Sequence, residues 1–380
     1  MENYNHLTPY NRVEIDLSAL RANYRQILAK VGENVKVMGI VKSDAYGHGL
    51  VPVAKVLADE GCRCFGVAET DEGISLRRAG VSGEIVVLLG ASPESFGEII
   101  EFGLQPVVFD RKVLAGLSSY AEHHNRQVGV HLKIDTGMGR LGIMPDQLDG
   151  FLKLLNESPG VRLAGILSHF PKADDLEDQA QALDQNRCFA EIVTSVRRNC
   201  GTIKVHMANS AAIINLPDSR YDMVRPGITL YGYYPFPSDK EYSGLELEPV
   251  MSFKTAVIQV KDVPSGYGIS YGHTYRTSRP TRLAVLPVGY DDGYLRRLSG
   301  KAEVIIDGKR APIVGRICMN ACLADITDLE GVGVGDEVVI MGRQGREEIT
   351  ADEIAGWSDT ISYEILCLFG GRNRRVYLPD

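Results

Sequence analysis

A lysine directly after an expected buried strand is the residue in this sequence with the clearest potential for chemistry. Lys42 follows the apolar, β-branched run Val35–Val41, and burying a lysine beside such a run costs free energy unless its amine has a partner. One function of such a lysine is to form a Schiff base with an aldehyde cofactor. The other interpretation is a lysine whose amine reaches solvent at the strand end. The local pattern alone does not decide between the two.

Other residues that could take part in binding stand at the end of this strand and of other expected strands. They are Tyr46 after the first strand, Lys133 and Arg140 at the fifth, His169 after the sixth, Asn209 and Ser210 after the seventh, and Arg225 with the backbone of Gly227 and Ile228 at the eighth. Taken singly, His169 is more often a hydrogen-bonded core histidine, and Lys133 or Arg225 could be structural. Together they favour one shared site. A lysine imine, two arginines and backbone N–H groups suited to phosphate favour pyridoxal phosphate as the cofactor.

The elements that position these residues alternate over the first two-thirds of the chain. The expected strands are Val35–Val41, Cys64–Ala68, Ile85–Leu89, Pro106–Phe109, Val128–Ile134, Leu163–Leu167, Lys204–Met207 and Met223–Arg225, and helical stretches lie between them. Eight strands separated by helices predict a parallel (β/α)8 TIM barrel. An open doubly wound sheet is the alternative, but no G-x-G-x-x-G motif follows the first strand.

The pattern changes near Pro249, after which strands predominate. The expected strands are Phe253–Val263, Leu283–Val288, Ala302–Ile306, Ala311–Val314, Ala321–Ile326 and Glu337–Met341, with a short helix in Glu348–Ser358. Asp307-Gly308 between two apolar runs predicts a hairpin. We therefore predict an α/β protein with an N-terminal (β/α)8 TIM barrel in residues 11–245. A C-terminal β-rich domain follows in residues 246–380, together with residues 1–10, and Pro235, Pro237, Ser238 and Gly244 mark the linker.

The composition of the 380-residue chain is that of a globular protein, with 44% hydrophobic and 24% charged residues. The net charge of −8 and the lack of a basic stripe argue against nucleic acid as a partner. No run of 18 apolar residues and no signal-peptide pattern is present, so no membrane association is expected. Seven cysteines without an export signal indicate the reducing cytoplasm. No metal-ligand spacing is evident, and we expect no metal.

Several motifs together resemble those of the alanine racemase family, over nearly the whole chain. They are Val41–Gly49, His131–Arg140, Met223–Gly227, Ser270–Gly272, Val288–Tyr290 with Asp292-Gly293, Gly315–Met319 and Ile361–Glu364. The resemblance implies a pyridoxal-phosphate enzyme with a barrel and a β-domain. Such an enzyme interconverts L-alanine and D-alanine by a two-base mechanism and supplies D-alanine for peptidoglycan.

The resemblance also implies roles for individual residues. Lys42 would carry the cofactor and act as one base, and Tyr271 of the partner subunit would be the other. The cofactor would further contact Tyr46, Arg140, His169, Asn209, Ser210, Arg225, Gly227, Ile228 and Tyr363, with Arg225 at the pyridine nitrogen. Arg140 and the backbone N–H of Met319 would bind the substrate carboxylate, and Tyr290 would line the entrance channel. Lys133 would be carbamylated, as in many members, and the active form would be a homodimer with shared sites.

The sequence departs from the family's pattern at two places, and three other functions compete with alanine racemisation. Asn320 stands where the family usually has aspartate, and Pro171-Lys172 stand where it has small residues. The competitors are a racemase that prefers another substrate such as serine, a decarboxylase of the same fold, and a cofactor carrier built on the barrel alone. Arg225 argues against the decarboxylases, which place a carboxylate at the pyridine nitrogen. The β-domain motifs around Tyr271 and Met319 argue against a carrier.

Overall fold

The computed structural model describes residues 10–175, 178–236, 241 and 243–379. Residues 1–9 and the expected linker residues Pro237 and Ser238 lie outside the described residues. The chain divides into two compact units. One unit, here called the barrel unit, comprises Leu20–Ala45 and Leu50–Glu248. The other, the β unit, comprises, among the described residues, 10–19, Tyr46–Gly49 and 249–379.

Eight parallel strands close into a barrel in the barrel unit, which confirms the predicted (β/α)8 fold. They run in sequence order around the barrel: β2 (Lys36–Ile40), β3 (Cys64–Val67), β4 (Glu84–Val87), β5 (Gln105–Val108), β6 (Val128–Lys133), β7 (Val161–Leu167), β8 (Lys204–Asn209) and β9 (Met223–Arg225). The barrel closes because β9 pairs with β2, with Lys36 opposite Met223 and Val37 opposite Val224. The near-continuous apolar runs of the strands suit burial on both faces.

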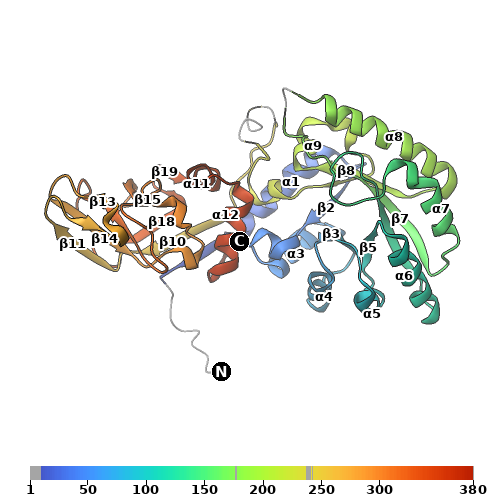
Figure 1. Ribbon diagram of the computed structural model, residues 1–380, viewed down its shortest axis with the longest axis horizontal. Helices are drawn as coiled ribbons and strands as arrows, with labels where there is room; N and C mark the ends of the chain where they lie inside the picture. The colour runs from blue at the N-terminus through green and yellow to red at the C-terminus, as the bar shows by residue number, and fades with distance from the viewer. Residues whose placement is uncertain (1–9, 176–177, 237–240, 242, 380) are drawn as a thin grey trace. The chain divides into compact units, whose positions relative to one another are not determined.

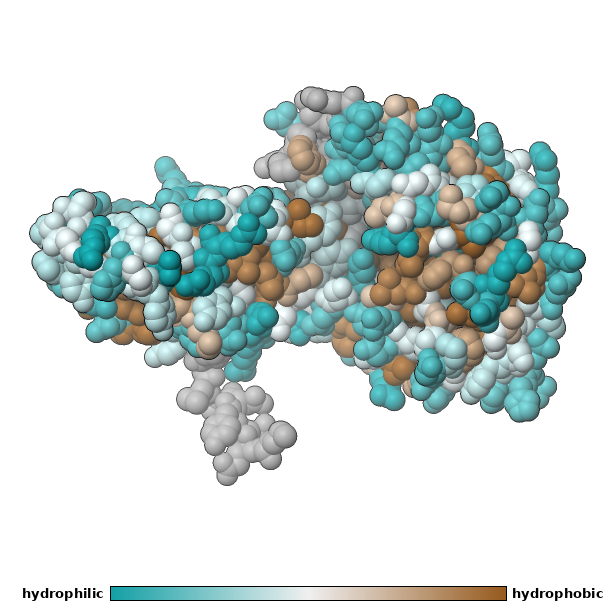
Figure 2. All heavy atoms as spheres, in the orientation of Figure 1, coloured by the Kyte–Doolittle hydropathy of each residue, from teal (hydrophilic) through white to brown (hydrophobic). Residues whose placement is uncertain are grey.

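Helices lie around the outside of the barrel strands (Figure 1). They are α3 (Leu50–Asp59), α4 (Thr70–Arg78), α5 (Phe96–Glu101), α6 (Arg111–His123), α7 (Leu148–Asn156), α8 (Ala180–Cys200) and the short α9 (Ser210–Asn215). The longest, α8, buries Phe189, Ile192, Val193 and Val196 at helical spacing. Hydrophilic residues predominate over the outer rim of the barrel unit on the face in Figure 2. The helix α1 (Leu17–Val31), which precedes β2, was not predicted.

The β unit holds a sheet in the order β16-β15-β18-β10-β1-β20, with β19 on β18. Its strands are β1 (Arg12–Asp16), β10 (Met251–Ala256), β15 (Glu303–Ile306), β16 (Lys309–Pro312), β18 (Glu337–Gln344), β19 (Glu347–Ile349) and β20 (Arg375–Leu378). A second sheet has the order β11-β14-β17, from β11 (Gln259–Val263), β14 (Thr281–Leu286) and β17 (Cys322–Asp325). The strands β12 (Gly268–Ile269) and β13 (Tyr275–Arg276) form a separate pair, and the helices are α11 (Ala351–Ser358) and α12 (Ser362–Arg372).

Three details of the β unit bear on the sequence predictions. The strand Arg12–Asp16 lies between β10 and β20 of this sheet, whereas the sequence analysis grouped residues from 11 onwards with the barrel. The single strand expected over Phe253–Val263 is two strands, β10 and β11, which belong to different sheets. The Asp307-Gly308 hairpin joins β15 to β16 with φ of 51° and 68°, as its sequence predicts.

Among the described residues, no helix is both long and apolar enough to cross a membrane.

Candidate active site

The polar residues predicted at strand ends do lie at the carboxyl-terminal end of the barrel. Lys42 comes just after β2, Lys133 is the last residue of β6, and Arg225 is the last residue of β9. Asn209 and Ser210 form the junction between β8 and α9, and His169 follows β7. Because parallel strands in a closed barrel end on the same side, these groups share one mouth.

The segment after Lys42 has an unusual backbone. Ser43, Asp44, Ala45 and Tyr46 all have φ between 53° and 56°, which makes the turn α2 (Lys42–Tyr46) left-handed. Each such residue costs about 1–2 kcal/mol relative to a right-handed conformation. Asp44 helps to hold the turn, because its Oδ1 accepts the N–H of Leu50 at 2.7 Å and its own N–H donates to Glu72 Oε1 at 3.2 Å. Strain of this kind concentrates at functional sites.

The loop that carries Arg140 is built around one carboxylate. Asp135 accepts four backbone N–H groups at 2.8–3.1 Å, those of Gly137, Met138, Gly139 and Arg140. Burial opposes ionisation of Asp135, but these four donors outweigh it and lower the pKa of the carboxyl. Thr136 Oγ1 and Ser168 Oγ, 2.8 Å apart, tie the same loop to the end of β7.

Arg225 is buried, and its guanidinium is surrounded by acceptors. It donates to the carbonyl oxygens of His206 at 2.8 Å, Ser168 at 2.7 Å and Met207 at 3.0 Å. Its nitrogens also lie 3.0 Å from His206 Nδ1 and 3.2 Å from His169 Nδ1. A guanidinium has only donors, so both of these ring nitrogens must be acceptors.

This requirement sets the hydrogen positions along a chain of side chains through the barrel. With Nδ1 of His206 an acceptor, its Nε2 carries the proton and donates to His131 Nδ1 at 2.9 Å. His131 Nε2 therefore also carries a proton and donates to Gln105 Oε1 at 3.0 Å. Both histidines are neutral, and burial together with nearby cations lowers the pKa of His131 to about 3 and holds that of His206 well below its usual value. We call this series the histidine relay (Arg225, His206, His131, Gln105).

Backbone and hydroxyl groups converge after β8 and β9. Ser210 Oγ accepts the N–H of Gly227 at 2.9 Å and lies 3.1 Å from Thr229 Oγ1. Gly227 directly precedes the 3-10 helix Ile228–Tyr231, and Asn209 caps α9 by accepting the N–H of Ala212 at 3.0 Å. Two helix starts and a hydroxyl therefore meet at one point, an arrangement that suits a phosphate group.

Lys133 is 5% exposed and lies among cations. Burial, followed by the charges of Arg225 and Arg140, lowers the pKa of Lys133 to about 7. Its amine is therefore largely unprotonated at slightly alkaline pH, unlike an ordinary lysine.

In the β unit, three predicted residues gather around one group of turns. Ser270 precedes Tyr271, and its Oγ donates to the carbonyl of Arg316 at 2.6 Å. The N–H of Tyr290 donates to Cys318 O at 3.1 Å, next to Met319. The residues Tyr271, Met319 and Tyr290 are 67%, 54% and 39% exposed. Asn320, the departure from aspartate, donates from Nδ2 to Asp291 Oδ2 at 3.4 Å.

The β unit also places Tyr46 beside Tyr363. Their ring centroids are 6.0 Å apart and the rings are tilted by 47°. Gly47 follows with φ of 84°, and a Cβ there would lie 2.6 Å from the carbonyl oxygen of Leu366, so only glycine fits.

Comparison with known proteins matches both halves of the chain to one family. Residues 15–235 match the model of the alanine racemase N-terminal domain, and residues 250–377 match that of the C-terminal domain. The alanine racemase of Halothermothrix orenii is 42% identical over 365 residues, covering 96% of each chain. This chain belongs to the alanine racemase family.

Two solved alanine racemases show the same fold. The enzyme from Bacillus anthracis, with bound L-Ala-P, has a TM-score of 0.91 and 35% identity, covering 98% of this chain and 96% of that one. The enzyme from Bartonella henselae, with covalently bound pyridoxal phosphate, has a TM-score of 0.87 and 28% identity, covering 98% and 100%. Membership of the alanine racemase family makes this chain an isomerase.

The alanine racemase fold brings the predicted residues into two groups. Those of the barrel unit are Lys42, Lys133, Arg140, His169, Asn209, Ser210, Arg225, Gly227 and Ile228, and those of the β unit are Tyr46, Tyr271, Tyr290, Met319 and Tyr363. Sequence reasoning missed Ser168, His206 and Thr229, which contact Arg225 or Ser210. A signal for His206 was present, since it is a histidine inside the apolar strand β8. No cluster of His, Cys, Asp and Glu that could bind a metal ion occurs among the described residues.

Proposed function

We propose that this alanine racemase interconverts L-alanine and D-alanine with pyridoxal phosphate held covalently on Lys42. The observation that carries the proposal is that β8, β9 and β2 are consecutive neighbours in the barrel. Their ends supply three groups that fit the three parts of this cofactor: Ser210 for a phosphate, Arg225 for a ring nitrogen and Lys42 for an aldehyde. The Bartonella henselae and Bacillus anthracis relatives, with pyridoxal phosphate and L-Ala-P bound, support it.

The cofactor, when bound, supplies an electron-withdrawing ring joined to the nitrogen of the amino acid. The remaining work falls to residues of this chain. Ser210, the N–H groups of Gly227 and Ile228, and the hydroxyls of Tyr46 and Tyr363 would bind the phosphate. Asn209 and His169 would position their neighbours, Asn209 as the cap of α9 and His169 as an acceptor for Arg225. Arg225 can only donate, so it would leave the ring nitrogen without a proton.

Racemisation requires one acid/base group on each side of the reacting carbon. The amine of Lys42 would serve one face. Tyr271 of a second copy would serve the other face. Arg140 and the N–H of Met319 would hold the substrate carboxylate, and Tyr290 would line its entrance.

The state of Lys133 belongs to the same proposal. An unprotonated amine is the form that reacts with CO2, and the pKa of Lys133, lowered to about 7, makes that form available. Carbamylation would convert this neutral amine into an anion, with release of a proton, and the anion can pair with Arg140.

We further propose a homodimer that works in the cytoplasm. The exposed Tyr271 and Met319 are large side chains gathered on one region of the β unit, as expected of a surface that a second copy covers. No disulfide bond forms among the described residues, which supports a reducing compartment.

The test follows the α-proton from each enantiomer in deuterated water. Lys42→Ala should abolish both exchange and the absorbance of the covalently bound cofactor. Tyr271→Phe should reduce exchange from one enantiomer more than from the other, because each base serves one face. Racemase activity in Lys42→Ala, or equal small losses for both enantiomers in Tyr271→Phe, would contradict the two-base assignment. A panel of L-amino acids including serine, assayed for D-product, tests the preference for alanine.

A further inference from the structure

A cavity of about 880 Å³ opens at the amino-terminal end of the barrel, and no role in racemisation accounts for it. The first residues of four strands line it: Lys36 of β2, Glu84 of β4, Gln105 of β5 and Lys204 of β8. In TIM barrels, catalysis is located at the opposite end, and this end ordinarily contributes to stability. The volume is that of a small-molecule site.

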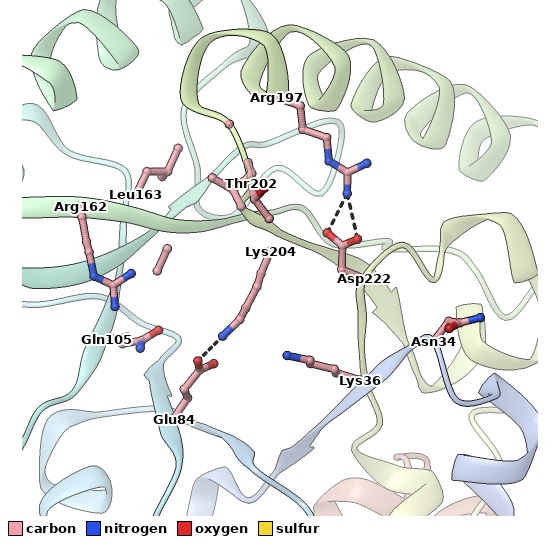
Figure 3. Close-up of a pocket in the computed structure, with 13 residues that line it drawn as sticks. Asn34, Lys36, Glu84, Gln105, Arg162, Leu163, Arg197, Thr202, Lys204 and Asp222 are labelled. Atoms are coloured by element: carbon pink, nitrogen blue, oxygen red, sulfur yellow. Dashed lines mark hydrogen bonds and ion pairs between the residues drawn. The ribbon is translucent and has the colours of Figure 1, made fainter.

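The charges in this cavity are not balanced. Lys204 forms an ion pair with Glu84, and Arg197 forms one with Asp222 at 2.8 Å, so both carboxylates of the lining are occupied (Figure 3). The backbone N–H of Lys36 donates to Asp222 O at 2.9 Å, but the side chains of Lys36 and Arg162 make no hydrogen bond or ion pair within the described part of the chain. Figure 3 shows both cationic groups directed into the space around the Lys204–Glu84 pair. Although the protein has a net charge of −8, the surplus of cationic side chains makes this cavity locally positive, so it attracts anions.

A glycine leaves space for the guanidinium of Arg162. Its guanidinium packs against Gly129 of β6, where a Cβ would lie 3.3 Å from Arg162 Nη2. Gly129 lies two residues before His131 on the same strand, and the charge of Arg162 acts on His131. The glycine therefore lets the guanidinium lie next to the end of the histidine relay. Gln105, whose Oε1 accepts from His131, leaves its amide nitrogen as a further donor in the lining.

Not all of the lining is charged. Leu163, Ala164 and Ile203 contribute apolar surface to the same cavity. Two unpaired cations, an amide donor and an apolar wall together match a small organic molecule that carries one phosphate group. Arginine binds phosphate through paired N–H donors and lysine binds it as a point charge.

We propose that this cavity binds a phosphomonoester through Lys36, Arg162 and Gln105, with the organic part against Leu163, Ala164 and Ile203. The site contains none of the residues assigned to racemisation, and its ligand would lie beside His131 and Gln105 at the far end of the relay. Arg162 and Lys204 both help to lower the pKa of His131. An anion bound beside them offsets their field and alters the environment of His131.

Binding is tested by calorimetry on the protein with its cofactor bound, so that the Ser210 site is filled. Glycerol 3-phosphate should bind saturably at one site, and more tightly than inorganic phosphate. Lys36→Ala and Arg162→Ala should each weaken it about tenfold, the usual effect of losing a charge-assisted hydrogen bond. Arg198→Ala is the matched control, since Arg198 is exposed on the last turn of α8 beside Arg197 but does not line the cavity.

Three calorimetric outcomes would overturn the proposal. They are no saturable binding, equal affinity in the wild type and both cavity variants, and equal affinity for inorganic phosphate and glycerol 3-phosphate. The last would assign the cavity to free phosphate rather than to a phosphomonoester.

The location is tested by nitrogen NMR of the histidine side chains. Glycerol 3-phosphate, at a concentration near its wild-type Kd, should shift the ring signals of His131 in the wild type and shift them much less in Arg162→Ala. Binding that leaves the His131 signals unchanged in the wild type would place the ligand elsewhere and reject the cavity. Neither measurement depends on turnover, so a failure here is distinct from a failure of the racemase assignment.

Discussion

Arg225 determines the chemistry of its surroundings because it has donors and no acceptor. Every group that meets its guanidinium must accept, so His206 and His169 are neutral with Nδ1 unprotonated. The pKa of each histidine is lowered by burial and then by Arg225 itself, which agrees with that assignment. At the cofactor nitrogen the same property would withhold a proton and limit electron withdrawal by the ring.

Replacing Arg225 with glutamate should therefore change the outcome of the reaction and not only its rate. A carboxylate can accept, so it would favour a protonated ring nitrogen and a longer-lived deprotonated substrate. We expect slower racemisation and more pyruvate from transamination per turnover. Arg225→Lys, which keeps the positive charge, should lower activity without raising pyruvate.

Arg198→Glu is the control for the change in charge on an exposed surface. Unchanged pyruvate in Arg225→Glu, in protein shown to be folded by circular dichroism, would reject the proposed role of Arg225.

At the scale of elements, strands β6 and β8 each carry one buried histidine, and the two rings meet over Gly165 of β7, the strand between them. Gly165 of β7 makes this possible, because a Cβ there would lie 2.6 Å from His131 Nδ1 and 2.7 Å from the carbonyl oxygen of Lys204. The barrel interior thus contains a continuous polar path where side chains of TIM barrels are mostly apolar. The hydrogen bonds of this path are kept only while both histidine rings stay neutral.

Mildly acidic pH should therefore lower the free energy of unfolding of the protein. His131, His169 and His206 have lowered pKa values when folded, near 3 for His131, and take up protons near pH 6.5 when unfolded. Their contribution is complete above about pH 6.5 and is lost as the pH falls toward the folded values. Each fully titrating histidine should reduce the free energy of unfolding by about 1.4 kcal/mol per pH unit.

Urea unfolding at pH 7.5, 6.5 and 5.5 measures this slope. His206→Asn should reduce it, and His123→Asn, at the exposed end of α6, should not. A free energy of unfolding that stays constant over this range would contradict neutral buried histidines.

At the scale of the whole molecule, the predicted residues fall in two units of one chain. The barrel unit holds Lys42, Arg140 and Arg225, whereas the β unit holds Tyr271 and Met319. A homodimer in which each site draws Tyr271 from the second copy accounts for the exposure of that side chain.

Such sharing predicts complementation between inactive variants. Lys42→Ala and Tyr271→Ala, each inactive alone, should regain activity when the two are unfolded, mixed in equal amounts and refolded together. Half of the dimers would be hybrids with one intact site of two, so the mixture should reach about a quarter of wild-type activity. Each variant refolded alone is the control. Activity that stays at the level of the separate variants would mean that each copy completes its own site.

Local signals in the sequence determined much of this protein. The eight barrel strands, the lysine after the first, the Asp307-Gly308 hairpin and the motifs of the family all lie within short segments. Periodicity and turn preferences act over a few residues, so they can be read without the fold. The alternation of strand and helix then made the barrel predictable, and with it the shared end where Lys42 and Arg225 lie.

Only the tertiary structure decided which distant segments meet. The strand Arg12–Asp16 joins the C-terminal sheet through pairs with β10 and β20, which no local pattern indicates. The left-handed turn after Lys42 runs against the preference of its residues and is held in part by Asp44, Glu72 and Leu50. The relay from Arg225 to Gln105, and the cations Lys36 and Arg162 of the cavity at the amino-terminal end of the barrel, depend on six neighbouring strands, β5 to β9 and β2. Packing of the whole chain sets long-range contacts of this kind, because it contributes more to the free energy of folding than local propensity does.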